Sequence, residues 1–189
     1  MKRFLLSSLL IPLLIASCGG SETTEGENSD GTDTSNVDYS GMSEMPLKDH
    51  GLNMKIMLPN VESNVGSAIE PKVEHEDGDY LWHVKIGPKF HLIIEDFGKE
   101  KNKVANEKAR LDDLSRIFVV EYIEDNENLI MYKRTLHEDQ GGQTTYHCYG
   151  ETTIDGYTYV LRSEEEGNFR PIIEDMVKTI KSAKPIGAS

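Results

Sequence analysis

Hydrophobic and polar residues alternate with a period of two over much of the chain after residue 51, as is typical of β-strands with one buried face. Residues 52–58 alternate in this way and stop at Pro59-Asn60, which predicts a first strand. Residues 80–86 and 90–97 are joined by Gly87-Pro88-Lys89 and predict a hairpin. Pairing them through this loop places six apolar side chains on one buried face, namely Trp82, Val84, Ile86, Phe90, Leu92 and Ile94.

The pattern changes in the middle of the chain. Residues 117–123 and 129–132 are apolar at both odd and even positions, which predicts central strands covered on two faces, with a turn at 125–128. Gly141-Gly142 and Asp155-Gly156 predict the turns of two further hairpins. Pairing Ile154 with Tyr157 puts Tyr159, Leu161, Gly150 and Cys148 on one face. The parity of residues 129–136 stays open because both of its faces are mixed.

Two stretches have helical spacing instead. In residues 102–116 and just beyond, Val104, Leu111, Leu114 and Phe118 recur at helical spacing, and Asn102 is a candidate N-terminal cap. Residues 169–183 carry a stripe typical of a helix packed on a core, made of Ile172, Ile173, Met176, Val177 and Ile180. Pro171 fits the first turn of this helix and Asn168 is its candidate cap.

The order of these elements predicts an α+β fold, an antiparallel sheet of about six or seven strands packed with two amphipathic helices. In residues 52–184 this order, with a last hairpin followed by an amphipathic C-terminal helix, resembles PsbP-like domains. The resemblance implies an accessory or assembly role and not a reaction, because a shared fold does not fix a function.

The N-terminus carries a different signal. Lys2 and Arg3 precede an apolar run from Phe4 to Ile15, and Ile15-Ala16-Ser17-Cys18 follows. This stretch resembles the signal of bacterial lipoproteins, with residues 1–17 as the signal peptide and Cys18 as the first mature residue. The resemblance implies a diacylglyceryl group on Cys18, usually with an N-acyl chain such as palmitate, which together suffice to hold a chain on a membrane. No later segment reaches eighteen consecutive apolar residues.

Residues 18–45 predict a lipidated, acidic and disordered tether, because they contain almost nothing to bury. After Cys18 the tether holds no Lys or Arg and seven acids, namely Glu22, Glu25, Glu27, Asp30, Asp33, Asp38 and Glu44. One interpretation is a solvated spacer repelled from an anionic membrane. The other is an export signal, since such spacers resemble those of Bacteroidota surface lipoproteins. We therefore expect the outer membrane, with the periplasmic leaflet and the cell surface both open.

Residues 46–189 predict one domain, large enough to be stable without a disulfide or a metal. The chain has 20 basic and 33 acidic residues; without Lys2, Arg3 and the seven tether acids, 18 basic and 26 acidic residues leave a net charge of −8. This charge argues against nucleic acid as a partner and against peripheral binding to anionic lipid. The membrane, reached through the acyl chains on Cys18, and an unknown protein are the expected partners.

Cysteine and histidine offer little evident chemistry. With Cys18 lipidated, Cys148 has no partner for a disulfide, and we expect an inert core thiol. His147 points to the opposite face of the same strand, so the two cannot act together. His83 and His91 share a hairpin face in diagonal positions, roughly 7–8 Å apart by strand geometry. A metal there would need a third ligand, so ordinary surface histidines are favoured.

Acid clusters and tyrosines are the other candidate site residues of the domain. Residues 74–79 are interpreted as a turn in preference to a calcium loop, because they lack the ligand spacing of an EF-hand. Residues 164–166, all Glu, are interpreted as a solvated edge before the last helix. Six tyrosines gather in the second half of the chain, at positions 122, 132, 146, 149, 157 and 159. They suit a structural role in strands, but Tyr149 faces away from Tyr157 and Tyr159 and is the candidate for docking a protein or glycan.

No nucleophile elbow, phosphate-binding glycine loop or dinucleotide fingerprint occurs, and no catalytic residue, cofactor or metal is expected. The sequence thus predicts a lipid-anchored envelope protein that acts as a non-enzymatic interaction or assembly module. Two alternatives stay open: a solute- or glycan-binding lipoprotein with a pocket between sheet and helix, and a hydrolase with unrecognised residues. A pocket would favour the solute- or glycan-binding lipoprotein, whereas a convergent His–acid pair in a cleft would favour the hydrolase.

Overall fold

A computed structural model of the chain describes residues 37–65 and 68–187. The elements follow the order β1 (Met42–Pro46), η1 (Lys48–His50), β2 (Met54–Pro59), β3 (Lys72–Glu74), β4 (Leu81–Ile86), β5 (Phe90–Asp96), α1 (Lys103–Asp113), η2 (Leu114–Arg116), β6 (Phe118–Asp125), β7 (Leu129–Leu136), η3 (Glu138–Gln140), β8 (Thr144–Ile154), β9 (Tyr157–Ser163), α2 (Arg170–Ser182) and β10 (Lys184–Pro185). This is an α+β fold, as the sequence predicts.

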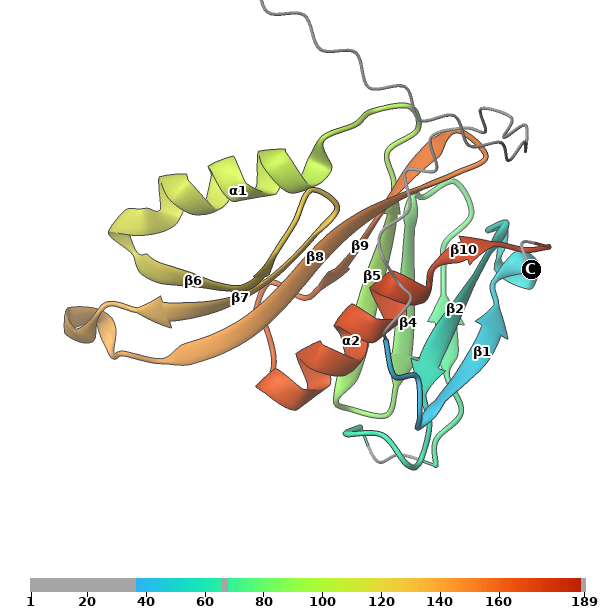
Figure 1. Ribbon diagram of the computed structural model, residues 1–189, viewed down its shortest axis with the longest axis horizontal. Helices are drawn as coiled ribbons and strands as arrows, with labels where there is room; N and C mark the ends of the chain where they lie inside the picture. The colour runs from blue at the N-terminus through green and yellow to red at the C-terminus, as the bar shows by residue number, and fades with distance from the viewer. Residues whose placement is uncertain (1–36, 66–67, 188–189) are drawn as a thin grey trace, which may run out of the picture. The chain divides into compact units, whose positions relative to one another are not determined.

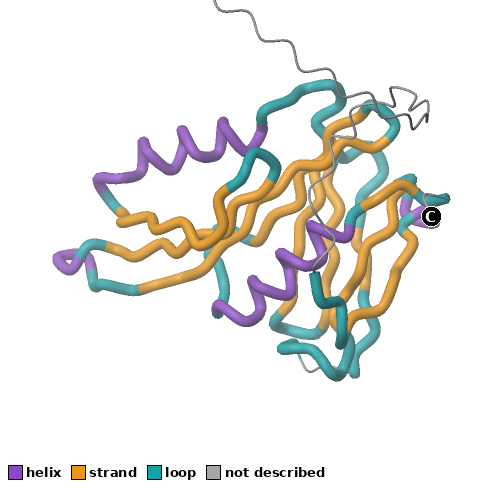
Figure 2. The backbone as a smooth tube through the Cα atoms, in the orientation of Figure 1, coloured by secondary structure: helices purple, strands orange, loops and turns teal. Residues whose placement is uncertain are grey.

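The strands form two antiparallel sheets (Figure 1). The large sheet has the order β3-β4-β5-β9-β8-β7-β6, and the small sheet has the order β1-β2-β10. Figure 2 places helix α2 between the two sheets and α1 over β6 to β8. The large sheet therefore has one face that is covered by α2 and the small sheet, and a second face that α1 covers at one end.

The main core lies between α2 and the two sheets. The predicted hairpin is confirmed, because Trp82, Val84 and Ile86 pair with Ile94, Leu92 and Phe90 and all six side chains are buried. The predicted helix stripe is also confirmed, since all five of its residues belong to this core. Helix α2 approaches β8 so closely that a Cβ on Gly150 would lie 2.5 Å from Cγ2 of Ile180.

Strand β7 is buried on both faces, as predicted, and the structure resolves its parity. Leu129 and Met131 enter the main core, whereas Ile130 and Tyr132 join a second cluster with Val104 and Leu111 of α1. The prediction for residues 117–123 is wrong. Strand β6 is the last strand of the large sheet, and most of its side chains are at least partly exposed. Apolar residues at both odd and even positions thus reflect burial on two faces in β7, whereas in β6 they belong to an exposed edge strand.

The boundaries differ from the prediction in two places. Residues 42–46 form β1 and pair with β2, so the folded part begins inside the stretch assigned to the tether. Asn102 occupies the N-cap position of α1, as predicted, but its side chain makes no capping hydrogen bond, and the N-cap of α2 is Phe169 instead of the predicted Asn168. Asn102 has a φ of 61°, and the carboxylate of Glu151 on β8 accepts the N–H of Val104 at 3.0 Å instead. A residue distant in sequence thus caps α1.

Candidate functional site

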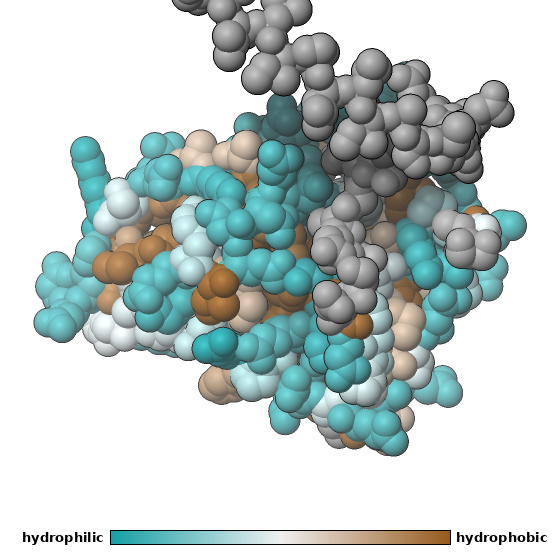
Figure 3. Space-filling model, in the orientation of Figure 1, coloured by the Kyte–Doolittle hydropathy of each residue, from teal (hydrophilic) through white to brown (hydrophobic). Residues whose placement is uncertain are grey.

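A prominent surface feature lies along β6, one of the two edge strands of the large sheet. We call it the β6 edge and define it as residues 117–123. Of nine large hydrophobic residues exposed in the described part of the chain, four lie here: Ile117, Val119, Tyr122 and Ile123. Each is 37–44% exposed. Hydrophobic residues gather over β6 in the space-filling view (Figure 3). An exposed apolar edge strand offers unpaired backbone groups to another chain.

The acids of β6 are held by lysines from neighbouring elements. Glu121 lies 2.7 Å from the ammonium of Lys133, and Glu124 lies 2.9 Å from that of Lys181 on α2. Asp125 pairs with Lys108 on α1. These pairs leave the edge without an unpaired acid, so its exposed character is apolar.

A register shift between Tyr122 and Glu124 explains how both helices reach this strand. Tyr122 pairs with Tyr132 and Glu124 pairs with Met131, so Ile123 is the extra residue of a β-bulge. The bulge sends Glu124 to the face of α2 and Asp125 to the face of α1. The C-terminal end of β6 is therefore fixed on both faces, and the stretch before it is the accessible part of the edge.

Beneath α1 the second face of the large sheet holds a crevice of about 200 Å³. It is lined by charged residues and tyrosines, including Glu95, Glu107, Arg110, Tyr132, Tyr149, Arg162, Glu164 and Glu165. Burial raises the pKa of the hydroxyls of Tyr132 and Tyr149 above the ordinary value, and the charge of Glu107 adds to this effect. Both hydroxyls therefore stay protonated.

The charges of the crevice pair with one another. Arg110 forms two hydrogen bonds of 2.7 Å with Glu107, and these bonds raise the pKa of Arg110. Arg162 contacts Glu95 at 2.9 and 2.5 Å. Glu165 lies 3.4 Å from Arg110. A ligand in the crevice would have to compete with these internal pairs, which weakens the case for a solute site here.

His83 and His91 approach more closely than their diagonal positions predict. Nδ1 of His83 and Nε2 of His91 are 2.9 Å apart, and Nδ1 of His91 lies 2.6 Å from Glu164. Since the carboxylate accepts the proton of Nδ1, Nε2 of a neutral His91 accepts from His83. Burial lowers the pKa of His91 below its ordinary value, and this effect exceeds the opposing effect of Glu164.

This His–His–Glu chain brings a His–acid pair together, as a hydrolase would need. It reaches no hydroxyl or thiol in the described part of the chain, so no nucleophile completes it. Within residues 37–65 and 68–187, no group of three or more His, Cys, Asp or Glu side chains is arranged to hold a metal ion. Residues 164–166 are largely exposed, as the interpretation of a solvated edge expects, but Glu164 and Glu165 also bind His91 and Arg110.

The remaining predicted sites are structural. Cys148 is buried in the main core, and burial raises the pKa of its thiol to about 12, as expected of an inert cysteine. His147 lies on the opposite face, as predicted, stacked on Tyr132. Residues 76–79 form the predicted turn, in which the N–H of Asp79 donates to the carbonyl of Glu76. Tyr149, the candidate for docking, is half-buried against the cluster beneath α1 and lines the crevice there.

The signal peptide, Cys18 and most of the predicted tether lie outside the described residues. No described helix is long and apolar enough to cross a bilayer. Comparison with protein-family models and with curated proteins finds no match.

Proposed function

We propose that this chain is a lipid-anchored protein of the cell envelope whose domain binds another protein and performs no catalysis. The observation that supports the proposal most directly is the β6 edge, an exposed apolar strand at the end of a seven-stranded sheet. Partner chains commonly add a strand to such an edge: backbone hydrogen bonds supply affinity, and side-chain contacts supply specificity. The anchor is Cys18, on the resemblance of residues 1–18 to a lipoprotein signal.

The chemistry of the edge defines its partner. Glu121 and Glu124 are paired with lysines, so a charged partner segment would gain little there. Val119, Ile123 and the ring of Tyr122 offer apolar contacts on both sides of the strand. We therefore expect an extended, apolar segment of another protein.

The test is an affinity pull-down of the acylated protein from membranes after mild crosslinking. The variant Val119→Lys/Ile123→Lys places two charges on the edge without removing a buried group. The matched control is Val61→Lys, because Val61 is 59% exposed and lies outside β6. Exposed positions of this kind change the free energy of unfolding by about 0.5 kcal/mol or less, so both variants should fold.

We expect a stoichiometric partner with the wild-type chain and with Val61→Lys, and its loss with the double variant. Equal recovery with all three chains would contradict the role of the β6 edge, and recovery of the wild-type chain without any partner would contradict the binding function itself. The anchor is tested separately. Cys18→Ala should move the chain out of the membrane fraction, and continued membrane retention would exclude a lipid on Cys18 as the anchor.

A further inference from the structure

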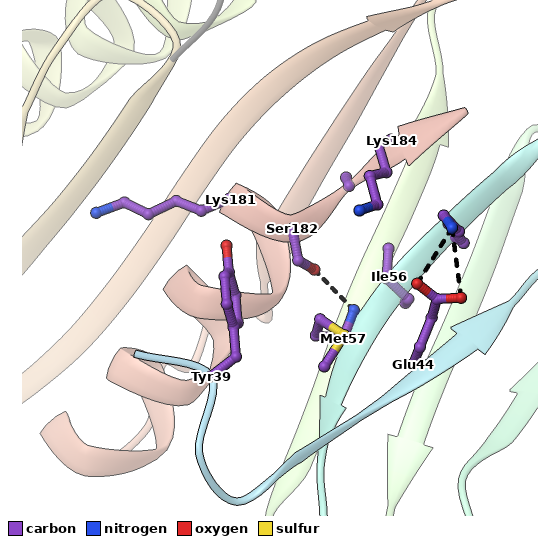
Figure 4. A pocket seen from close by; sticks show the side chains of 9 residues that line it. Tyr39, Glu44, Ile56, Met57, Lys181, Ser182 and Lys184 are labelled. Carbon is purple, nitrogen blue, oxygen red and sulfur yellow. Dashed lines mark hydrogen bonds and ion pairs between the residues drawn. The ribbon is translucent and has the colours of Figure 1, made fainter. Parts of the chain in front are cut away.

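A basic notch lies at the junction of the small sheet with the C-terminal end of α2 (Figure 4). Its volume is about 320 Å³, at the small end of the range of about 300–1,000 Å³ typical of small-molecule sites. The lining residues are Tyr39, Glu44, Lys55, Ile56, Met57, Lys181, Ser182, Ala183 and Lys184. Three of the nine are lysines, in a chain of net charge −13.

The notch exists because β10 is only two residues long. Strand β10 covers the edge of β2 only at Lys55 and Met54. Beyond β10, the backbone N–H of Met57 on β2 donates to Oγ of Ser182 at 2.7 Å. The hydroxyl of Ser182 in turn donates to the carbonyl of Thr179. The backbone beside the notch is thus satisfied, and the side chains above it determine what can bind.

Two like charges face each other across this short strand pair. Lys184 on β10 is directly opposite Lys55 on β2, an arrangement that destabilises a sheet. Lys55 is compensated by Glu44 at 3.2 Å, but the side chain of Glu44 is half exposed. The side chain of Lys184 forms no ion pair or hydrogen bond within residues 37–65 and 68–187. Figure 4 shows its ammonium between Ser182 and Ile56, toward the notch.

Tyr39 adds a neutral donor. Its ring lies beside α2 and its hydroxyl points toward the notch (Figure 4). Burial raises the pKa of this hydroxyl, so it stays protonated and able to donate a hydrogen bond. Lys181, by contrast, is held by Glu124 at 2.9 Å. Among the described residues, the side-chain donors of the notch without an internal partner are therefore Lys184 and Tyr39, while Lys55 is shared with Glu44.

We propose that the notch binds a phosphate group, carried by a soluble phosphomonoester or by a lipid headgroup. An anion between Lys55 and Lys184 removes the repulsion between them, and ammonium groups are common phosphate ligands. The volume leaves room for the part of the molecule that carries the phosphate. This site is independent of the β6 edge, so either proposal can fail without the other.

The first test measures the unfolding temperature of the full acylated chain in detergent, in inorganic phosphate and in chloride at equal ionic strength. Phosphate should raise the unfolding temperature of the wild-type chain. Lys184→Ala should weaken the apparent affinity for phosphate about tenfold, and Tyr39→Phe should weaken it less. The control Lys99→Ala removes an exposed lysine outside the notch and should leave the affinity unchanged. Absence of a phosphate effect, or equal affinity in Lys184→Ala, would overturn the proposal.

A second readout has the opposite sign. In chloride, Lys184→Ala should raise the unfolding temperature by about 1–3 °C, because it removes the repulsion with Lys55. A lysine with a purely structural role would give a decrease, and a decrease would count against the proposal.

The source of the phosphate is distinguished by two probes. Glycerol phosphate tests a soluble ligand, and vesicles of phosphatidylcholine with or without phosphatidic acid test a headgroup. A response that Lys184→Ala abolishes supports the proposal and assigns the source to that probe. If neither response depends on Lys184, the proposal is wrong.

Discussion

His147 illustrates how burial changes the chemistry of a single residue. It is 2% exposed, is stacked on Tyr132 and has Nε2 2.7 Å from the hydroxyl of Thr145. Burial, with Arg134 as a further cause, lowers its pKa from 6.5 to about 3. The folded protein thus holds a neutral imidazole at pH values where the unfolded chain binds a proton.

The sign of the effect on stability follows from this difference. Above about pH 6.5 His147 is neutral in both states and has no effect; as the pH falls from about 6.5 toward 3, protonation favours the unfolded state. Between about pH 7 and 5 we expect a loss on the order of 2 kcal/mol from this group. Urea unfolding of the wild-type chain and of His147→Gln measures it. Between these two pH values the free energy of unfolding of His147→Gln should fall by less than that of the wild-type chain, the difference being the contribution of His147. An identical pH dependence of the two chains would show that His147 is not responsible.

At the scale of elements, an edge strand has to be ordered without a second neighbour. Strand β6 meets this need through its bulge, which lets Lys108 of α1 and Lys181 of α2 hold its end from opposite faces. Partly exposed ion pairs of this kind are worth about 0.2–1 kcal/mol each. The anchored end then keeps the apolar stretch before it in a fixed position, which a partner strand would need.

We therefore predict that Lys108→Ala/Lys181→Ala accelerates hydrogen exchange at the end of β6. The amides of Glu124 and Asp125 should exchange about two- to tenfold faster, since two weak pairs are lost. Lys101→Ala, an exposed lysine before α1, is the control. Unchanged exchange in the double variant would show that the bulge alone orders this strand.

At the scale of the domain, α2 joins the two sheets into one core. Its stripe packs with Met54 and Ile56 of the small sheet and with Leu161 and Cys148 of the large sheet. Trp82 is a second link, because its indole N–H donates to the carbonyl of His50 at 2.7 Å. His50 belongs to η1, between the first two strands of the small sheet.

One core predicts one unfolding transition. Trp82 is the chain's single tryptophan and reports the contact between the sheets, whereas far-UV circular dichroism reports all of the secondary structure. In urea the two signals should change at the same midpoint. An earlier change in the Trp82 fluorescence would show that the small sheet unfolds separately.

Much of this architecture follows from local pattern. Period-two alternation determines the first hairpin and its register, and period 3.6 determines the stripe of α2, because each period directly encodes which side chains share a face. The lipoprotein-like signal is also local, since it depends on residues close in sequence. The opposite faces of His147 and Cys148 follow from strand geometry alone.

The order of strands in the sheet is not local, and the sites depend on it. An apolar stretch is equally compatible with a central strand and with an exposed edge, so residues 117–123 could be placed at the edge only once every other strand had found its neighbours. Two other contacts also depend on the packing of distant segments. Glu164 binds His91, which is 73 positions away, and Lys55 of β2 lies opposite Lys184 of β10. The sequence by itself determined most of the strands, both helices and the candidate anchor but not β1, β3 or β10. Tertiary structure decided which surfaces are free to bind, because exposure and charge pairing arise only when distant segments pack.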